Sequence, residues 1–362
     1  MKAGILTFHR AANYGAVLQA YALHAAITKL GIDCEFVDYE CEYLHKTHSP
    51  LKFFYVKGLK MKLMQLVFFP TKLRKRLLFN KFIYGKLKLG NTRYIGEKQI
   101  SADKSVSKAY DRFIVGSDQV WNPRLTRLDS VYFLSFVDDS FRKASYAASF
   151  GVSNIYDEVS EFMATHLSSF ENIAVREKRG AELINSLTDK DAMVVLDPTL
   201  LLTADEWRNF CEKPAQSKYI VLYTVDKSQP LVDFAVELSK ETGMQVLFIN
   251  DALRRSSHVK YMSKTTPEEW VGLFANADYV VTNSFHGLAF ALNFNKDMCI
   301  GLSTEKVNHN SRLTSLLDTL GISYSEKEAV NVLKDKVNWD DINKNLTAER
   351  EKSIAFLKGV FS

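Results

Sequence analysis

Cysteine is scarce in this chain, and the four cysteines lie far apart. Cys34, Cys41, Cys211 and Cys299 form neither a C-x-x-C pair nor a His/Cys spacing of the kind that binds zinc. A small secreted domain held by disulfides would need more cysteines at closer spacing. We therefore expect a reducing, cytoplasmic location and no metal site.

Long hydrophobic runs are also missing. The apolar stretch after Lys2 ends at His9, which is too short for the core of a signal peptide. A membrane span needs roughly 20 apolar residues, and the sequence holds no such stretch. Because 46% of its 362 residues are hydrophobic, the chain can instead bury the cores of two domains.

Acidic residues are absent from one long segment. Between Glu42 and Glu97 there is no Asp or Glu, whereas 13 Lys and Arg residues occur there. The net charge of the whole chain is only +5, so the remainder of the chain is acidic. A local excess of this kind does not predict a uniformly basic surface, and we expect no nucleic-acid partner.

The basic segment has helical periodicity over about residues 51–89. Leucines recur on one face, and Pro70 interrupts the pattern, which predicts two helices inserted into the first domain. Two interpretations remain open. The insertion makes a peripheral contact with the inner face of the membrane, because cationic amphipathic helices bind anionic lipids. Alternatively, it is a solvated basic face that covers the domain.

Strand and helix patterns alternate along most of the chain, which is typical of parallel α/β folds. We predict an N-terminal α/β domain over residues 1–212 and, after the polar stretch 213–218, a second α/β domain over 219–325. Residues 326–362 form a helical segment that is able to pack back on the first domain. The expected fold is two Rossmann-like domains that face each other across a cleft.

Polar residues follow the predicted strands of the first domain. His9, Arg10, Asn13 and Gly15 lie between the first strand and the first helix. The carboxyl end of a parallel strand beside a helix N-terminus suits an anionic ligand.

Similar residues follow later strands of this domain. Ser117 and Asp118 come after the strand that ends at Val115 and are candidates for substrate binding, although such residues most often cap a turn. Arg176 follows the strand that begins at Ile173 and, on composition alone, belongs to a solvated charged turn.

The second domain contains a histidine at a strand-to-helix junction. A buried strand ends at Thr282, and Asn283, Ser284 and His286 lead into an apolar helix. His286 is a candidate general acid or base, or else a capping or packing histidine. Arg312 opens a later helix and, taken alone, would be a surface residue.

These motifs together resemble the polysaccharide pyruvyl transferase family. The motifs that carry the resemblance are Gly4-Ile5-Leu6-Thr7-Phe8-His9, Asn13-Tyr14-Gly15-Ala16, Gly116-Ser117-Asp118-Gln119-Val120-Trp121-Asn122, Ser145-Tyr146-Ala147-Ala148-Ser149-Phe150-Gly151, Val175-Arg176-Glu177, Leu196-Asp197-Pro198-Thr199 and Asn283-Ser284-Phe285-His286-Gly287. They occur in this order over about residues 1–325. The resemblance implies a GT-B-like fold and transfer of pyruvate from phosphoenolpyruvate to a pair of sugar hydroxyls in surface glycan biosynthesis, with no cofactor.

The resemblance also implies roles for individual residues. Its well-known members carry the catalytic histidine in an Arg-Leu-His motif, which His286 matches, and Arg176 matches an arginine that holds the donor. This chain has Ser284 where those members have the arginine. A hydroxyl cannot replace a bidentate guanidinium, so either Arg10 or Arg312 supplies the cation or the donor differs.

Two other functions remain open. A nucleotide-sugar glycosyltransferase of the same fold often carries a ribose-binding carboxylate on the corresponding helix, but no acidic residue lies between Asp278 and Asp297. A non-catalytic glycan-binding protein would account for the serine at position 284. The acceptor, a sugar or a lipid-linked glycan, is not specified by the sequence.

Overall fold

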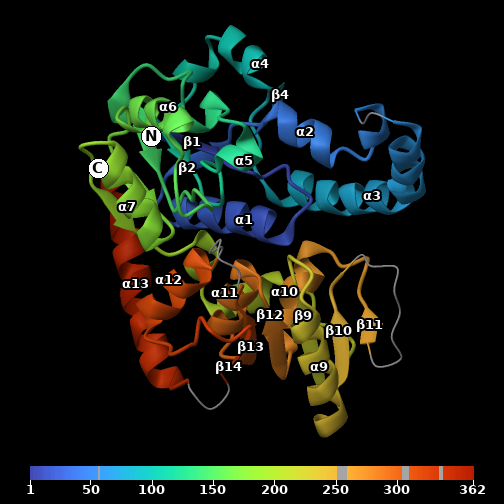
Figure 1. The fold of residues 1–362 in the computed structure, drawn as a ribbon. Helices are drawn as coiled ribbons and strands as arrows, with labels where there is room; N and C mark the ends of the chain where they lie inside the picture. Colours follow the sequence, from blue (N-terminus) through green and yellow to red (C-terminus); the bar gives the residue numbers. More distant parts are fainter. Residues whose placement is uncertain (56–57, 251–258, 304–309, 334–336) are drawn as a thin grey trace. The chain divides into compact units, whose positions relative to one another are not determined.

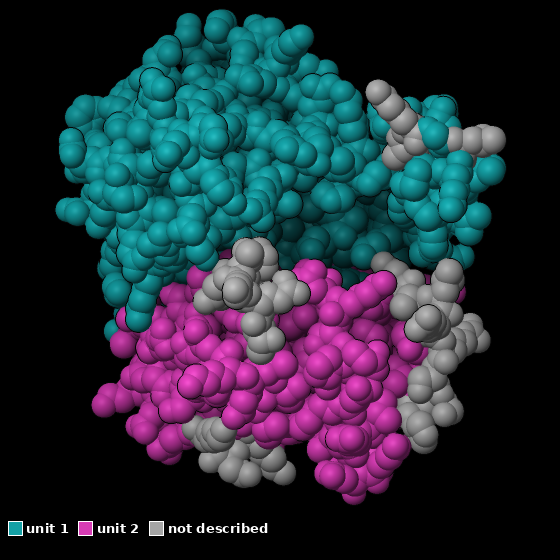
Figure 2. Space-filling model, in the orientation of Figure 1, with its two compact units in different colours: residues 1–201, 350–362 teal, residues 202–349 magenta. Residues whose placement is uncertain are grey.

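The computed structural model describes the chain except for residues 56–57, 251–258, 304–309 and 334–336. It contains two compact units, unit 1 with residues 1–201 and 350–362, and unit 2 with residues 202–349 (Figures 1 and 2). Each unit contains its own sheet with parallel strands. The expectation of two Rossmann-like α/β domains is confirmed, whereas the cleft between them stays a prediction.

The main sheet of unit 1 has four parallel strands in the order β2-β1-β5-β6 (Figure 1). The chain places β2 on one side of β1 and then crosses to place β5 and β6 on the other. Ligands of such sheets bind at the carboxyl ends of the strands where the order reverses, which is between β1 and β5. The strands and helices of unit 1 are β1 (Lys2–Leu6), α1 (Tyr14–Lys29), β2 (Asp33–Phe36), β3 (Tyr39–Glu40), α2 (Glu42–His48), α3 (Leu59–Lys86), β4 (Tyr94–Ile95), α4 (Glu97–Ala102), β5 (Arg112–Val115), α5 (Pro123–Thr126), β6 (Lys143–Ser145), α6 (Asp157–Leu167), β7 (Ile173–Val175), α7 (Lys178–Leu187) and β8 (Ala192–Val194).

Local sequence explains both ends of α1. The side chain of Asn13 accepts a hydrogen bond from the Ala16 N–H at 3.2 Å and so caps the first turn. At the other end Gly31 has a φ of 80°, a conformation that glycine adopts without strain, and its N–H bonds to Thr28. Gly31 is therefore the helix stop that the sequence predicts.

The prediction of two helices in the basic segment is wrong. Residues Leu59–Lys86 form the single helix α3, which continues through Pro70. Proline removes one backbone N–H, so the carbonyl four residues earlier loses its partner. Both Leu66 and Pro70 are exposed, so water can hydrate that carbonyl, and the C-terminal part of the helix stays attached through the buried Phe79 and Phe82.

Aromatic packing builds the core of unit 1. Trp121 is fully buried, and its ring lies within 6 Å of the rings of Phe133, Phe150 and Phe170, measured between centroids. The C-terminal residues 350–362 also belong to this unit, where the buried Ser353 hydroxyl accepts a hydrogen bond from the Leu196 N–H at 3.0 Å.

The sheet of unit 2 has the order β11-β10-β9-β12-β13-β14, and only β14 runs antiparallel to its neighbour. Its order reverses between β9 and β12, so the carboxyl ends of these two strands mark its expected ligand edge. The elements are α8 (Ala204–Phe210), β9 (Tyr219–Tyr223), α9 (Gln229–Thr242), β10 (Gln245–Phe248), β11 (Val259–Tyr261), α10 (Pro267–Asn276), β12 (Tyr279–Thr282), α11 (Phe285–Asn293), β13 (Asp297–Gly301), α12 (Ser311–Leu320), β14 (Val330–Val332) and α13 (Trp339–Val360), whose last residues belong to unit 1.

Residues 202–212, which the sequence analysis assigns to the N-terminal domain, belong to unit 2. The reason is the packing of α8. Trp207 is fully buried with its ring centroid 4.9 Å from that of Phe290, and the Leu202 carbonyl accepts a hydrogen bond from Asn293.

Candidate active site

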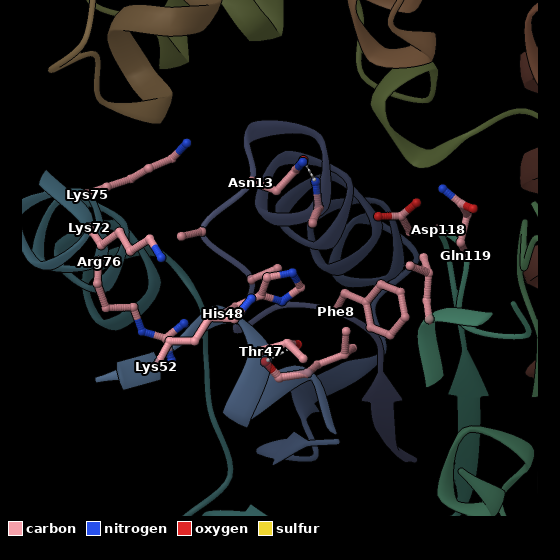
Figure 3. Close-up of a pocket in the computed structure, with 15 residues that line it drawn as sticks. Phe8, Asn13, Thr47, His48, Lys52, Lys72, Lys75, Arg76, Asp118 and Gln119 are labelled. Carbon is pink, nitrogen blue, oxygen red and sulfur yellow. Dashed lines mark hydrogen bonds between the residues drawn. The ribbon is translucent and has the colours of Figure 1, made fainter. Parts of the chain in front are cut away.

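A pocket of about 500 Å³ opens at the ligand edge of unit 1, beside the ends of β1 and β5. Figure 3 shows basic side chains on one side of it and Asp118 and Gln119 on the opposite side. The lining residues are Phe8, Ala11, Ala12, Asn13, Ala16, Leu44, Thr47, His48, Lys52, Lys72, Lys75, Arg76, Asp118, Gln119 and Leu125. The pocket thus lies where α/β sheets bind ligands. One side of it, the basic wall, consists of Lys52, Lys72, Lys75 and Arg76.

Burial and, to a smaller extent, neighbouring cations lower two pKa values at this wall. Burial lowers the pKa of His48 from its ordinary 6.5, and the nearby Lys52, Arg76 and Lys72 lower it further, against a weaker opposing effect of Glu40. Burial and Lys52 also lower the pKa of Lys72. The cations are close enough to destabilise one another, so an anion that binds among them is stabilised.

The N-terminus of α1 forms another part of the pocket. Asn13, which caps the helix, lines the pocket, and Gly15 lies buried in the first turn. The partial positive charge of a helix N-terminus adds to that of the lysines. Asp118 provides the one carboxylate among the lining residues. Its φ of 71° lies in the left-handed region, which aspartate adopts more readily than most residues.

His9 and Arg10 lie next to this pocket, but their side chains contact Asp38. Both side chains are buried, with His9 Nε2 3.2 Å from Asp38 Oδ1 and Arg10 Nε donating to the same oxygen at 2.6 Å. Burial raises the pKa of the Asp38 carboxyl, but its hydrogen bonds to His9 and Arg10 outweigh burial and hold the pKa at about 2. Arg10 also donates to the Tyr84 hydroxyl at 2.9 Å, so it links β1 to α3.

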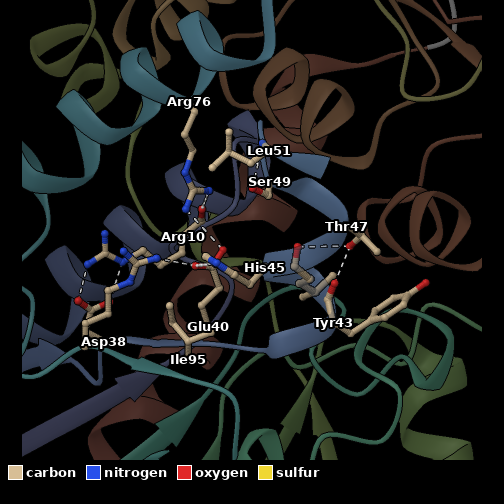
Figure 4. A network of polar contacts seen from close by, with 12 residues as sticks. Arg10, Asp38, Glu40, Tyr43, His45, Thr47, Ser49, Leu51, Arg76 and Ile95 are labelled. Carbon is tan, nitrogen blue, oxygen red and sulfur yellow. Dashed lines mark hydrogen bonds and ion pairs between the residues drawn. The ribbon is translucent and has the colours of Figure 1, made fainter. Parts of the chain in front are cut away.

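A polar network continues from Arg10 to the basic wall of the pocket (Figure 4). Arg76 donates to the Arg10 carbonyl at 2.7 Å and lies 3.5 Å from the Glu40 carboxylate. The same carboxylate lies 2.9 Å from His45 Nδ1 and accepts a hydrogen bond from Arg93 at 2.8 Å. Burial raises the pKa of Glu40, but these positive neighbours hold it below its ordinary value. The network fixes α3 against unit 1 and so fixes the wall.

Arg176 is enclosed by carboxylates. Its side chain is 1% exposed, and its guanidinium lies 3.0 Å from Asp197, 3.6 Å from Asp118 and 3.8 Å from Glu177. Ser117 joins the same cluster, because its hydroxyl donates to Asp197 at 2.9 Å. Arg176 therefore holds Asp118 beside the pocket, and the three carboxylates around it more than balance its single charge.

The ligand edge of unit 2 contains the other predicted residues. The side-chain oxygen of Asn283 accepts a hydrogen bond from the Val225 N–H at 2.9 Å, which ties the loop after β12 to the loop after β9. Ser284 caps α11 by accepting from the Gly287 N–H, and the buried His286 lies in the first turn of that helix.

Close packing fixes the position of His286. A Cβ atom at Gly287 would lie 2.3 Å from Thr282 Oγ1, so the start of α11 rests directly on the end of β12. Arg312 is partly buried in α12, which packs against α11.

The structure therefore forms two groups of predicted residues, one in each unit. His9, Arg10, Asn13, Gly15, Ser117, Asp118 and Arg176 surround the ends of β1, β5 and β7 in unit 1. Asn283, Ser284 and His286 share the end of β12 in unit 2. Sequence reasoning missed Asp38 and the pocket role of Lys72, Lys75 and Arg76. Two signals were available: Asp38 follows a strand, and the three cations recur at helical spacing.

Among the described residues, no group of three or more His, Cys, Asp or Glu side chains is arranged to hold a metal ion. None of the helices in the described part of the chain is both long enough and apolar enough to cross a membrane. All four cysteines are free thiols.

The sequence model of the polysaccharide pyruvyl transferases matches residues 13–300, which is most of the chain. The chain belongs to the polysaccharide pyruvyl transferase family. The matched part of this transferase includes His286, Arg176, Asp118 and the basic wall of the pocket, whereas His9 and Arg312 lie outside it. A search of curated proteins finds no match.

Several solved structures resemble this pyruvyl transferase family member over their whole length. The UDP-GlcNAc 2-epimerase of Methanocaldococcus jannaschii in complex with UDP-GlcNAc and UDP is 12% identical, with 97% of this chain and 93% of that chain covered and a TM-score of 0.48. The UDP-GlcNAc 2-epimerase of Neisseria meningitidis bound to UDP-GlcNAc is 10% identical, with 99% of this chain and 94% of that chain covered and a TM-score of 0.45. The E. coli heptosyltransferase WaaC with ADP is 11% identical, with 96% of this chain and 100% of that chain covered and a TM-score of 0.41. Similarity at this level assigns no substrate to the chain.

Proposed function

We propose that this protein transfers pyruvate from phosphoenolpyruvate to two hydroxyls of a glycan. The methylene carbon of the enol takes a proton and becomes the methyl group, and the adjacent carbon becomes cationic. One sugar hydroxyl adds to that carbon and loses its proton, phosphate leaves, and the second hydroxyl adds and loses its proton. The products are a cyclic pyruvate ketal and inorganic phosphate. Family membership over residues 13–300 carries this proposal.

His286 is the proposed proton carrier. An imidazole both donates and accepts protons near neutral pH, as the protonation of the enol and the deprotonation of a hydroxyl require. Its position supports this role, because it lies at the ligand edge of unit 2 on a capped and closely packed helix start. Such packing fixes the backbone that carries the ring, and a fixed backbone helps to place a proton donor within hydrogen-bond reach of its substrate.

The pocket of unit 1 is the proposed acceptor site. Its cations suit a phosphate or diphosphate group that carries the glycan, and Asp118 is an acceptor for sugar hydroxyl groups. Arg176 receives no part in donor binding, because the three carboxylates around it already balance its charge. Its role in this proposal is to position Asp118.

A coupled assay of phosphate release tests the reaction. The purified protein is incubated with phosphoenolpyruvate and a panel of sugar and glycan-diphosphate acceptors, and the ketal is identified by mass spectrometry. We expect release that depends on an acceptor and that falls by about 10²–10⁴ in His286→Gln. His166→Gln, which changes a partly buried histidine of α6, is the matched control and keeps its activity.

Two results would contradict the proposal. Wild-type activity in a folded His286→Gln variant removes the proposed proton carrier. Failure of phosphoenolpyruvate to bind to the wild-type protein in calorimetry, together with binding of a nucleoside diphosphate, replaces pyruvyl transfer by the chemistry of a nucleotide-sugar transferase.

A further inference from the structure

The helix α3 exposes apolar side chains that soluble proteins normally bury. Val67 is 72% exposed, Leu77 59% and Leu63 54%, and Phe54, in the turn before the helix, is 70% exposed. Scattered exposed hydrophobic residues are ordinary, but a continuous set on one element marks an interaction surface. Figure 1 shows α3 at the periphery of unit 1, beyond α2.

These side chains share one face of the helix. Each of residues 63, 66, 67, 70, 73 and 77 has another member of the set three or four positions away, so they form one stripe along α3. The stripe consists of Leu63, Leu66, Val67, Pro70, Leu73 and Leu77, all of which are exposed. It extends for about 20 Å at 1.5 Å per residue. The buried Phe79 and Phe82 attach the helix to unit 1 from another face, so the core of unit 1 does not need the stripe.

Charge identifies the partner. The exposed Lys60, Lys62, Arg74 and Lys81 accompany the stripe on α3, and the sequence from residue 43 to 96 has no acidic residue to balance them. Two copies of such a face would repel each other, whereas an anionic lipid surface offers both negative charge and an apolar layer. A basic residue near such a surface contributes about 1 kcal/mol.

We propose that the exposed stripe of α3 docks on an anionic membrane surface, with its leucines and valine in the acyl boundary and its lysines at the headgroups. The opposite side of the same helix supplies Lys72, Lys75 and Arg76 to the pocket of unit 1. Docking therefore brings the pocket close to the membrane surface. The inference depends on the exposure and charge of α3 and does not require the proposed reaction.

Co-sedimentation with vesicles tests the proposal on the full-length protein. The vesicles contain either phosphatidylcholine alone or phosphatidylcholine mixed with phosphatidylglycerol. We expect binding to the mixed vesicles only, and weaker binding as the salt concentration rises. The triple variant Leu63→Gln/Val67→Gln/Leu77→Gln, and separately Lys60→Gln/Lys62→Gln/Arg74→Gln, should each reduce the partition coefficient about tenfold or more.

Matched controls change similar residues elsewhere. Phe141→Gln removes an exposed apolar side chain outside α3, and Lys213→Gln/Lys227→Gln/Lys240→Gln removes three exposed charges in unit 2. Both control variants should bind the vesicles as the wild type does. Circular dichroism confirms that every variant is folded.

Three outcomes would overturn the proposal. The first is wild-type binding by both α3 variants. The second is loss of binding in the charge variant but not in the leucine–valine variant, which would leave only a nonspecific attraction to anions. The third is a stable dimer in solution that the leucine–valine variant dissociates, because the stripe would then be covered by a second copy of the chain.

Discussion

Arg176 donates from Nη1 to Asp197 Oδ2 at 3.0 Å, inside a cluster that has one buried guanidinium and three carboxylates. Asp197 also caps the short 3-10 helix Pro198–Leu200, so the cluster connects the ends of β5, β7 and β8. An arginine that holds so many neighbours has a structural role whether or not it touches a substrate.

Arg176→Met should therefore destabilise the protein strongly. Removal of the cation leaves buried carboxylates facing one another, and breaking a buried ion pair typically costs about 3–5 kcal/mol. Urea unfolding measures the change in the free energy of unfolding. Arg176→Met/Asp197→Asn should recover part of the loss, because it removes one of the carboxylates. A loss of under about 1 kcal/mol in the single variant would show that the cluster is not a stabilising unit.

Asp38 should make stability depend on pH in the acid range. Its pKa is about 2 in the folded protein and 3.8 ordinarily, so the folded state binds this proton less readily than the unfolded state. Stability from this group is complete above about pH 5 and is lost as the pH falls towards 2. The stability difference between wild type and Asp38→Asn should shrink by about 2 kcal/mol over this range. Unfolding curves at several pH values measure it, and a constant difference would contradict the shift.

Gly287→Ala should disturb the start of α11. The new methyl group would lie 2.3 Å from Thr282 Oγ1, so the helix must move, at a cost of about 1–3 kcal/mol. Because His286 is the preceding residue, activity should also fall under conditions in which the variant is still folded. Gly85→Ala in α3 is the control, since nothing lies within 4 Å of its Cβ position and alanine favours helix. Equal behaviour of the two variants in thermal unfolding and activity would refute the packing argument.

The basic wall of the pocket should respond to the loss of its lysines in two ways. In Lys52→Gln, the pKa of His48 should rise towards 6.5, because a positive neighbour that lowers it is gone, and NMR titration of the imidazole measures this.

Lys72→Gln/Lys75→Gln should raise the KM for a phosphorylated acceptor about tenfold with little change in the KM for phosphoenolpyruvate.

Two exposed lysines of the same helix provide the control for the wall. Lys81→Gln/Lys86→Gln removes the same charge from α3 outside the pocket and should leave both KM values unchanged. If instead the KM for phosphoenolpyruvate rises in Lys72→Gln/Lys75→Gln, the pocket holds the donor, and the assignment of the acceptor to unit 1 is wrong.

Features that depend on neighbouring residues could be predicted from the sequence. Alternating strands and helices predicted two parallel α/β units, and the cap at Asn13 and the stop at Gly31 lie where local chemistry placed them. His286 was found at a strand-to-helix junction for the same reason. Each of these signals lies within a few residues of the structure that it predicts.

Which charges are available to a ligand could not be predicted in this way, because it depends on contacts between distant parts of the chain. Arg10 and Arg176 looked like anion-binding residues, yet Asp38 neutralises Arg10, and three carboxylates, two of them distant in the sequence, surround Arg176. Lysines that looked like part of a solvated helix instead line a pocket. The reason is that parallel strands bring their carboxyl ends together from distant parts of the chain, so partners such as Asp38 for Arg10 and Asp197 for Arg176 are set by strand order and not by sequence spacing.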